Sequence, residues 1–243
     1  MIVADKLVKE FRDSRRGVMR AVDGVSFRCD PGRIYGLLGA NGAGKTTTLR
    51  MLATILAPTS GSASIAGFDI VHASHRVRAL IGFLSTATAL YGRLTAREMV
   101  EYLGRLHGLD ETTLSRRIQN LFHRLDLTAF ADRRCEHLST GIKQRVSIAR
   151  TLIHDPPVMI FDEPTAGLDV ISARTIVGFI RECRDHGKTV LFSTHVMSEA
   201  EKLCDYIGII HGSSLRTEGT LQELRDRYRQ NDLEEIFLRA VEA

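Results

Sequence analysis

The sequence predicts an α/β protein with a mostly parallel sheet, and three observations support this. A short apolar run, Ile34 to Leu38, precedes a glycine-rich loop and a helical pattern from Thr46 to Leu56. After residue 150, strand patterns and helical patterns alternate, which is typical of a parallel sheet. Between these regions, residues 87 to 150 have mainly helical periodicity. We therefore expect an α/β core that is interrupted by a helical insertion.

The first elements are strands. Val3 to Phe11 and Val22 to Arg28 are predicted as two strands joined by a charged turn, and Ser62 to Ala66 and Ile81 to Leu84 as two more. The other expected elements follow in chain order: a helix from the Thr95–Glu98 capping box to Leu106, a helix after Asp110, a helix from Ser139, a strand Val158–Phe161, a helix Ile171–Arg184, a strand Thr189–Phe192, a helix Met197–Leu203, a strand Ile207–Ile210 and a helix Leu233–Val241. The last helix has an apolar side, so we expect it to pack onto the domain or onto a second copy.

Length and composition are consistent with one large domain of 243 residues. The formal charge of +4 is mild and no basic run exceeds a pair, so a nucleic-acid surface is not indicated. The four cysteines lack C-x-x-C spacing, which indicates neither a zinc site nor a disulfide framework and favours a reducing cytosol. The charged N-terminus and the lack of a long apolar run predict a soluble chain without a membrane span.

The most informative motif is the loop from Gly39 to Thr46, which fits G-x-x-x-x-G-K-[ST] at every fixed position. Glycines let the backbone wrap closely around phosphates, and the amides at the following helix N-terminus face negative charge. In this pattern Lys45 reaches the β- and γ-phosphates, and the Thr46 hydroxyl ligates Mg²⁺. The sequence therefore predicts a site for a nucleoside triphosphate.

A second motif completes such a site. The apolar strand Val158 to Phe161 ends in Asp162 and Glu163. A strand that ends in two carboxylates is commonplace alone, but beside a phosphate loop Asp162 can hold the Mg²⁺ shell and Glu163 can polarise an attacking water.

A third motif, Leu138 to Arg145, opens a helix with exposed amides. Alone, its Ser139 is more consistent with an ordinary helix N-cap. Its place shortly before Asp162 and Glu163 resembles the L-S-G-G-Q signature of ATP-binding-cassette (ABC) ATPases. The same order of motifs continues with a D-loop-like stretch, Ala166 to Asp169.

Further stretches resemble this family over nearly the whole chain. Phe11 stands where family members stack a ring on adenine, His195 resembles the switch histidine, and Glu218-Gly219-Thr220 followed by Leu224 resembles the usual end of the core. Leu90 to Glu98 resembles the entry to the helical subdomain. The resemblance implies catalytic roles for Glu163, His195 and Lys45, Mg²⁺ ligation by Thr46 and Asp162, and nucleotide contacts at Phe11, Gly39, Asn41, Gly42, Ala43, Gly44, Lys45, Thr46, Thr47, Ser139, Gly141 and Asp169.

The resemblance also implies architecture and partners. It predicts a single ABC ATPase domain, residues 1–243, with a phosphate-loop NTPase core of RecA-like type (1–86 and 151–243), an N-terminal antiparallel β subdomain and an inserted α-helical subdomain (87–150) that carries the signature. Two such domains are expected to pair head to tail around two ATP molecules and Mg²⁺. The second domain is a copy or a homologous subunit. An integral membrane permease is expected to bind near Thr86 to Arg97, which would hold this cytoplasmic chain on the inner face of the membrane.

Two positions depart from the family pattern. Thr86 aligns with the Q-loop glutamine, and Thr140 and Ile142 replace a glycine and a glutamine of the signature. Both variants resemble those of the sodium-efflux and related subgroup of bacterial ABC exporters, so the resemblance implies an exporter ATPase. Two alternatives stay open: a soluble ABC ATPase that acts on nucleic acid or ribosomes, and a nucleotide-binding regulatory module with little hydrolysis.

Overall fold

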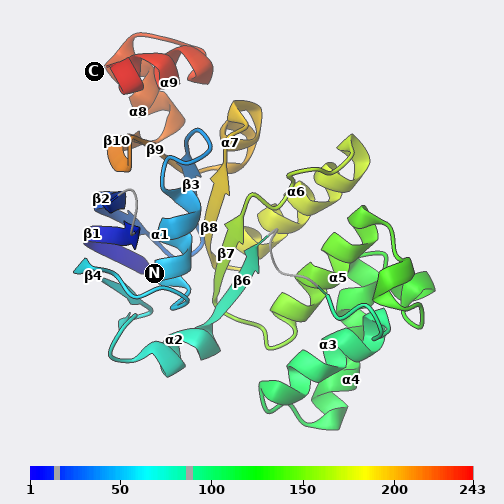
Figure 1. Ribbon diagram of the computed structural model, residues 1–243. Helices are drawn as coiled ribbons and strands as arrows, with labels where there is room; N and C mark the ends of the chain where they lie inside the picture. Colours follow the sequence, from blue (N-terminus) through cyan, green and yellow to red (C-terminus); the bar gives the residue numbers. More distant parts are fainter. Residues whose placement is uncertain (14–16, 86–89, 243) are drawn as a thin grey trace. The chain divides into compact units, whose positions relative to one another are not determined.

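The computed structural model describes residues 1–13, 17–85 and 90–242, and its elements group into two units (Figure 1). The first unit comprises Met1–Ile81, Pro157–Glu163 and Ile180–Ala243, and the second comprises Gly82–Pro156 and Pro164–Phe179. The expected helical subdomain, residues 87–150, lies within the second unit, and its status as a subdomain stays a prediction. No helix in the described ranges combines the length and apolar character needed to cross a bilayer.

The first unit contains an antiparallel sheet of strand order β2-β1-β4-β5. Its strands are β1 (Ile2–Asp13), β2 (Gly17–Cys29), β4 (Ser60–Ile65) and β5 (Phe68–Asp69). The two predicted N-terminal strands are confirmed and are longer than expected, because β1 and β2 pair from Ile2 and Cys29 out to Asp13 and Gly17. The antiparallel β subdomain inferred from the sequence is therefore present.

A second sheet forms the core of the first unit, where its strands run in the order β10-β9-β3-β8-β7. These strands are β3 (Ile34–Leu38), β7 (Val158–Asp162), β8 (Thr189–Thr194), β9 (Tyr206–His211) and β10 (Ser214–Gly219). β3 pairs in parallel with β8 and β9, and β7 with β8. Every residue of β3, β7 and β8 is buried, as expected for strands covered on both faces. Their carboxyl ends meet at one edge of the sheet, which brings together the segments that follow them.

The helices and strands of the first unit differ from expectation in two ways: one helix is shorter, and four elements were not predicted. α1 (Lys45–Leu52) ends before the predicted Leu56, since Thr54 adopts a left-handed φ of 60° that a helix cannot continue. The short β5 and three further elements were not predicted: α2 (Ser74–Leu80), β10 and α8 (Leu221–Tyr228). α7 (Met197–Leu203) matches its prediction. α9 (Leu233–Glu242) buries Leu233, Ile236 and Ala240 in a cluster with Leu38 and Ile207, so its predicted packing onto the domain is confirmed.

The second unit is mainly helical, with β6 (Ile81–Ser85) at its entry. The predicted capping box begins α3 (Ala96–Leu106): the Glu98 amide donates to Thr95 Oγ1 at 3.1 Å and the Thr95 amide to Glu98 Oε2 at 2.8 Å. Asp110 caps α4 (Glu111–Arg124) by accepting from the Thr113 amide at 2.9 Å. α5 (Thr140–Leu152) follows, and α6 (Val170–Asp185) begins in this unit and ends in the first.

Candidate active site

The glycine-rich loop connects β3 to α1 and packs closely against neighbouring backbone. The Gly39 amide donates to the Thr194 carbonyl at 3.3 Å, and a Cβ at Gly39 would collide with the Ile210 carbonyl oxygen. Gly44 has a φ of 107°, and a Cβ there would lie 2.5 Å from the Ala21 carbonyl oxygen. Gly39 therefore needs glycine for space, and Gly44 for both space and conformation. The loop is held against the sheet edge at the end of β3.

Lys45 is the charged side chain of the loop, and it is buried, with 4% of its surface exposed. Its Nζ donates to the Gly39 carbonyl at 2.7 Å and to the Ala40 carbonyl at 3.0 Å, and it lies 3.2 Å from Glu163 Oε1. A hollow of about 130 Å³ opens beside it. The hollow is lined by Ala21, Asn41, Gly42, Gly44, Lys45, Thr46, Thr47 and Glu163. The loop, the lysine and the carboxylate predicted from two separate motifs thus line one space.

Thr46, Asp162 and Ser193 form a hydrogen-bonded group beside this hollow. Thr46 Oγ1 donates to Asp162 Oδ1 at 3.0 Å, and Ser193 Oγ donates to the same oxygen at 2.8 Å. Hydroxyl and carboxylate oxygens are the ligands that Mg²⁺ prefers, so the Thr46–Asp162 pair fits this ion. Within the described ranges no cluster of three or more His, Cys, Asp or Glu side chains could hold a metal. A metal at Thr46 and Asp162 would therefore need phosphate oxygens and water as its other ligands.

Glu163 has a backbone conformation that the sequence did not predict. Its φ is 47°, in the left-handed region that non-glycine residues rarely adopt. Its amide donates to both the Ser193 carbonyl at 3.2 Å and Ser193 Oγ at 3.1 Å. Strain of this kind, about 1–3 kcal/mol, persists where surrounding contacts enforce it and is concentrated at functional sites. Ser193 is the residue that enforces it.

His195 follows β8 and points to the same carboxylate. Its Nδ1 lies 3.2 Å from Glu163 Oε2, while Lys45 Nζ approaches Glu163 Oε1. Glu163 therefore contacts one cationic side chain and one imidazole through different oxygens. Glu163 thus directly contacts the other two residues with predicted catalytic roles.

Phe11 lies apart from this group. It is on β1 opposite Met19, and Lys9 Nζ lies 5.4 Å from its ring centroid. Phe11 is not one of the described residues that line the hollow beside Lys45. Its ring is half-buried and Met19 beside it is 55% exposed, so this part of the antiparallel sheet has an accessible apolar surface.

The signature residues lie in the second unit, at the start of α5. Ser139 is the N-cap, but its side chain makes no capping hydrogen bond. Gly141 is packed closely, because a Cβ there would lie 2.5 Å from Ser172 Oγ. That hydroxyl donates to Asp169 Oδ2 at 2.7 Å, and the hydrogen bond from the Ser172 amide contributes most to lowering the pKa of Asp169. Gly141 and Asp169, two of the three residues predicted to contact nucleotide from this side, thus lie next to Ser172. Thr86 lies outside the described residues.

Sequence reasoning missed Ser193. It lies in a strand of buried residues that the prediction ended one position earlier, at Phe192. A signal was present, because a serine next to a threonine at the end of an apolar strand must have hydrogen-bond partners when buried.

Comparison with known proteins agrees with this arrangement. The family model described as ABC transporter matches residues 22–166. The chain is 41% identical over 239 residues to the ABC transporter ATP-binding protein NatA of Bacillus subtilis (strain 168), covering 98% of this chain and 97% of the relative. It is 38% identical to the Nod factor export ATP-binding protein I of Ralstonia nicotianae, covering 92% and 70%.

Solved structures are similar over almost the full length. One, described as the ATP binding subunit of an ABC transporter, has a TM-score of 0.89 at 27% identity and 99% coverage of both chains. Another has a TM-score of 0.82 at 25% identity, with 90% of this chain and 98% of that one covered. It is a dimeric post-hydrolysis state of the ATP-binding cassette MJ0796 bound to ADP and Pi. The chain belongs to the ABC transporter family, as a member that binds and hydrolyses ATP.

Proposed function

We propose that this ATPase powers an exporter by closing on a second ATPase subunit around ATP. The observation that carries the proposal is the contact of Lys45 and His195 with the two oxygens of Glu163, beside the Thr46–Asp162 pair. Export is supported by relatives whose names include Nod factor export and daunorubicin resistance. These names favour a transporter over a nucleic-acid or ribosome ATPase, and an intact Glu163–His195 contact favours hydrolysis over a purely regulatory role.

Each site residue of the first unit has a distinct role in this proposal. The loop amides and Lys45 bind the phosphates of ATP, and Thr46 and Asp162 hold Mg²⁺, which neutralises charge that develops on the phosphates. Glu163 orients or deprotonates the attacking water, as its strained backbone directs the carboxylate toward the loop. His195 steadies both the Glu163 carboxylate and the γ-phosphate. Phe11 provides an apolar ring for the adenine from β1.

In this proposal, the second unit of the chain completes the ATP site of the partner subunit. The N-terminus of α5 presents backbone amides and a Ser139 hydroxyl that is free of a capping bond, and both can bind a γ-phosphate. Asp169 holds the Ser172 hydroxyl against Gly141 and thereby orients this helix start. Closure then depends on the γ-phosphate, and its hydrolysis lets the pair open. Support comes from solved relatives that are described as dimeric.

A permease is the second partner in this proposal, and it would hold the chain at the inner face of the membrane. An apolar hollow of about 450 Å³ in the second unit is lined by Tyr91, Gly92, Arg93, Leu94 and Tyr102. The Tyr91 and Tyr102 rings meet edge to face at 6.0 Å while staying 60% and 44% exposed. An amphipathic cytoplasmic segment of the permease suits this surface, which overlaps the predicted contact region, Thr86 to Arg97. Residues 86–89 lie outside the described ranges.

The deciding experiment is to purify the tagged chain from detergent-solubilised membranes and to identify what comes with it. We expect a multi-spanning membrane protein in stoichiometric amount, and its loss in a Tyr91→Ser/Tyr102→Ser variant. Leu238→Ser provides a matched control, since Leu238 is a 45% exposed apolar residue on α9. Recovery of ribosomes or nucleic acid instead of a membrane protein would contradict the proposal.

A further inference from the structure

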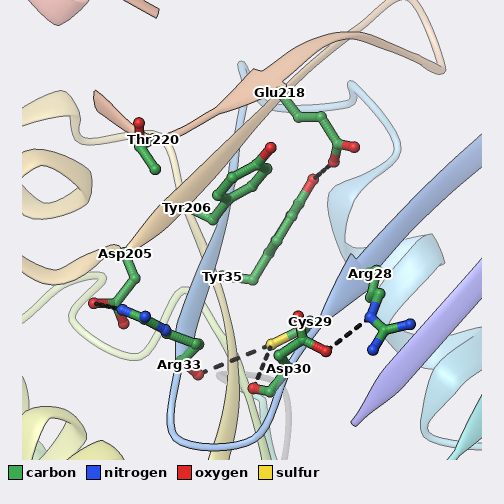
Figure 2. Close-up of a pocket in the computed structure, with 9 residues that line it drawn as sticks. All are labelled: Arg28, Cys29, Asp30, Arg33, Tyr35, Asp205, Tyr206, Glu218 and Thr220. Carbon is green, nitrogen blue, oxygen red and sulfur yellow. Dashed lines mark hydrogen bonds and ion pairs between the residues drawn. The ribbon is translucent and has the colours of Figure 1, made fainter. Parts of the chain in front are cut away.

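The first unit contains a second hollow, larger than the one beside Lys45. Two of its residues, Glu218 and Thr220, belong to the stretch that resembles the usual end of the family's core. It has a volume of about 420 Å³ and is lined by nine residues, all within the first unit (Figure 2). This volume is in the range of sites for small organic molecules, roughly 300–1,000 Å³. Its walls come from the end of β2, from β3, β9 and β10, and from the connections next to these strands.

This hollow lies at the opposite end of the parallel strands from the phosphate loop. Tyr35 is the second residue of β3 and pairs with Tyr206, the first residue of β9. The phosphate loop begins after Leu38, about 10 Å further along the strand at the usual rise per residue. None of the residues that line this hollow also lines the hollow beside Lys45.

One carboxylate in the lining of the hollow differs from the other two in its partners. Arg28 Nε lies 2.7 Å from Asp30 Oδ1, and Arg33 Nη1 lies 3.6 Å from Asp205 Oδ1. The third carboxylate, Glu218, has no ion pair with a basic side chain among the described residues. Its Oε2 accepts a hydrogen bond from the Tyr35 hydroxyl at 2.6 Å. Two guanidiniums and three carboxylates line the hollow, and two further guanidiniums lie next to it: Arg184 Nη1 is 3.9 Å from Asp205 Oδ1, and Arg227 Nη1 donates to the Glu218 backbone carbonyl at 3.2 Å. The Glu218 carboxylate is thus the acceptor in the lining that is left for a charged donor.

Tyr35 fixes the position of that carboxylate. Only 1% of Tyr35 is exposed, and burial, followed by the nearby Glu218 charge, raises the pKa of its hydroxyl well above the usual range. The hydroxyl therefore stays protonated and donates to Glu218. The Phe27 ring stacks on the Tyr35 ring, with centroids 4.8 Å apart. The carboxylate is thus oriented by a buried and rigid donor.

Aromatic surface adjoins the unpaired charge. The Tyr206 and Tyr35 ring centroids are 6.0 Å apart, and Figure 2 shows the two rings beside each other with Glu218 at the hydroxyl end of Tyr35. Ring faces attract cations through their negative electrostatic potential. A carboxylate beside an aromatic face is therefore complementary to a positively charged group on an apolar body.

We propose that this hollow binds a small organic cation, a primary ammonium or guanidinium group on a flat apolar body. The charged group donates to Glu218, and the apolar body packs on Tyr206. This site is independent of the proposed transport function, because none of its residues belongs to the ATP site.

The test uses three matched probes with the purified full chain: benzylammonium, benzyl alcohol and benzoate. Isothermal titration calorimetry and ligand-observed NMR should detect saturable binding of benzylammonium, with an affinity at least about tenfold above that of the alcohol and no binding of benzoate. Equal binding of ammonium and alcohol, preferred binding of benzoate, or no saturable binding of benzylammonium would each overturn the proposal.

Variants locate the site. Glu218→Gln keeps an acceptor for Tyr35 but removes the charge, so benzylammonium affinity should fall about tenfold or more. Glu235→Gln removes the same charge from an exposed position on α9 and should leave binding unchanged. Retained ATP binding by Glu218→Gln shows that this variant is folded. Unchanged benzylammonium affinity in Glu218→Gln would overturn the assignment.

Discussion

The phosphate-loop region and the signature region both supply predicted nucleotide contacts, yet they differ in how their polar groups are bonded. In the first unit, Lys45 and Glu163 contact each other, and Thr46 contacts Asp162. In the second unit, Ser139 stands at the N-terminus of a 13-residue helix without a side-chain capping bond. Thr95, Asp110 and Thr220, which also cap helices in this chain, all make that bond.

This difference indicates what the phosphate-loop region and the signature region each contribute to the proposed ATP site. The first region is a set of groups that hold one another in place, so a single subunit can position the Glu163 carboxylate. The second region has a hydroxyl and helix-end amides that are available to an external anion. Because the Ser139 side chain makes no capping hydrogen bond within its own chain, its loss is expected to affect turnover more than the free energy of unfolding. Mutations in each region can test this expectation.

The largest expected effect is that of Glu163→Gln. The amide keeps the shape of the side chain but cannot act as a base, so turnover should fall by about 10²–10⁴-fold. ATP binding should persist and a closed dimer should accumulate, which size-exclusion chromatography with ATP would detect. Glu234→Gln, at an exposed position on α9, is the control. Turnover close to that of the unmodified chain would exclude Glu163 as the base.

Ser193→Ala comes next, because it removes support from two residues at once. Its buried hydroxyl bonds both Asp162 Oδ1 and the Glu163 amide, so its loss should cost about 1–3 kcal/mol of unfolding free energy and lower turnover. Urea denaturation and the Mg²⁺ dependence of hydrolysis are the measurements, since a positioning role predicts a higher Mg²⁺ requirement. Ser147→Ala is the matched control, at a buried serine in α5. Equal effects of the two variants on stability and turnover would show that Ser193 contributes only to packing.

Ser193 and Glu163 also show what sequence patterns can and cannot predict. Apolar runs and fixed motif spacing predicted β3, β7 and β8, and parallel pairing brought the loop, Asp162 and His195 to one edge of the sheet. The φ of 47° at Glu163 could not be predicted, because it results from contacts with a distant strand and not from local preference. β10 was missed because its charged stretch, Arg216 to Glu218, depends on pairing with β9 for its conformation. α8 was missed although the sequence contains its capping-box pattern, Thr220 to Glu223.

Two N-cap variants compare the regions most directly. Thr95→Ala removes a complete capping box and should cost about 1 kcal/mol of unfolding free energy, with turnover per folded molecule unchanged. Ser139→Ala removes no capping bond, so stability should change less. Turnover should fall by about 10-fold or more, because a hydrogen bond to a charged phosphate is lost. Thermal unfolding and steady-state hydrolysis separate the two outcomes. If Ser139→Ala destabilised the chain as much as Thr95→Ala, its hydroxyl would have a structural role after all.

The smallest effect concerns pH and arises in the second unit. The His107 ring stacks on His154 with centroids 3.7 Å apart, and desolvation lowers the pKa of His107 below its ordinary value of 6.5. Between the folded and unfolded pKa values, the unfolded chain binds more protons. The contribution of His107 to stability is therefore complete above about pH 6.5 and is lost as the pH falls through the folded pKa. Urea denaturation at pH 7.5 and pH 5.5 should show a decrease that is smaller in His107→Gln. An identical decrease in both proteins would assign the pH dependence to other groups.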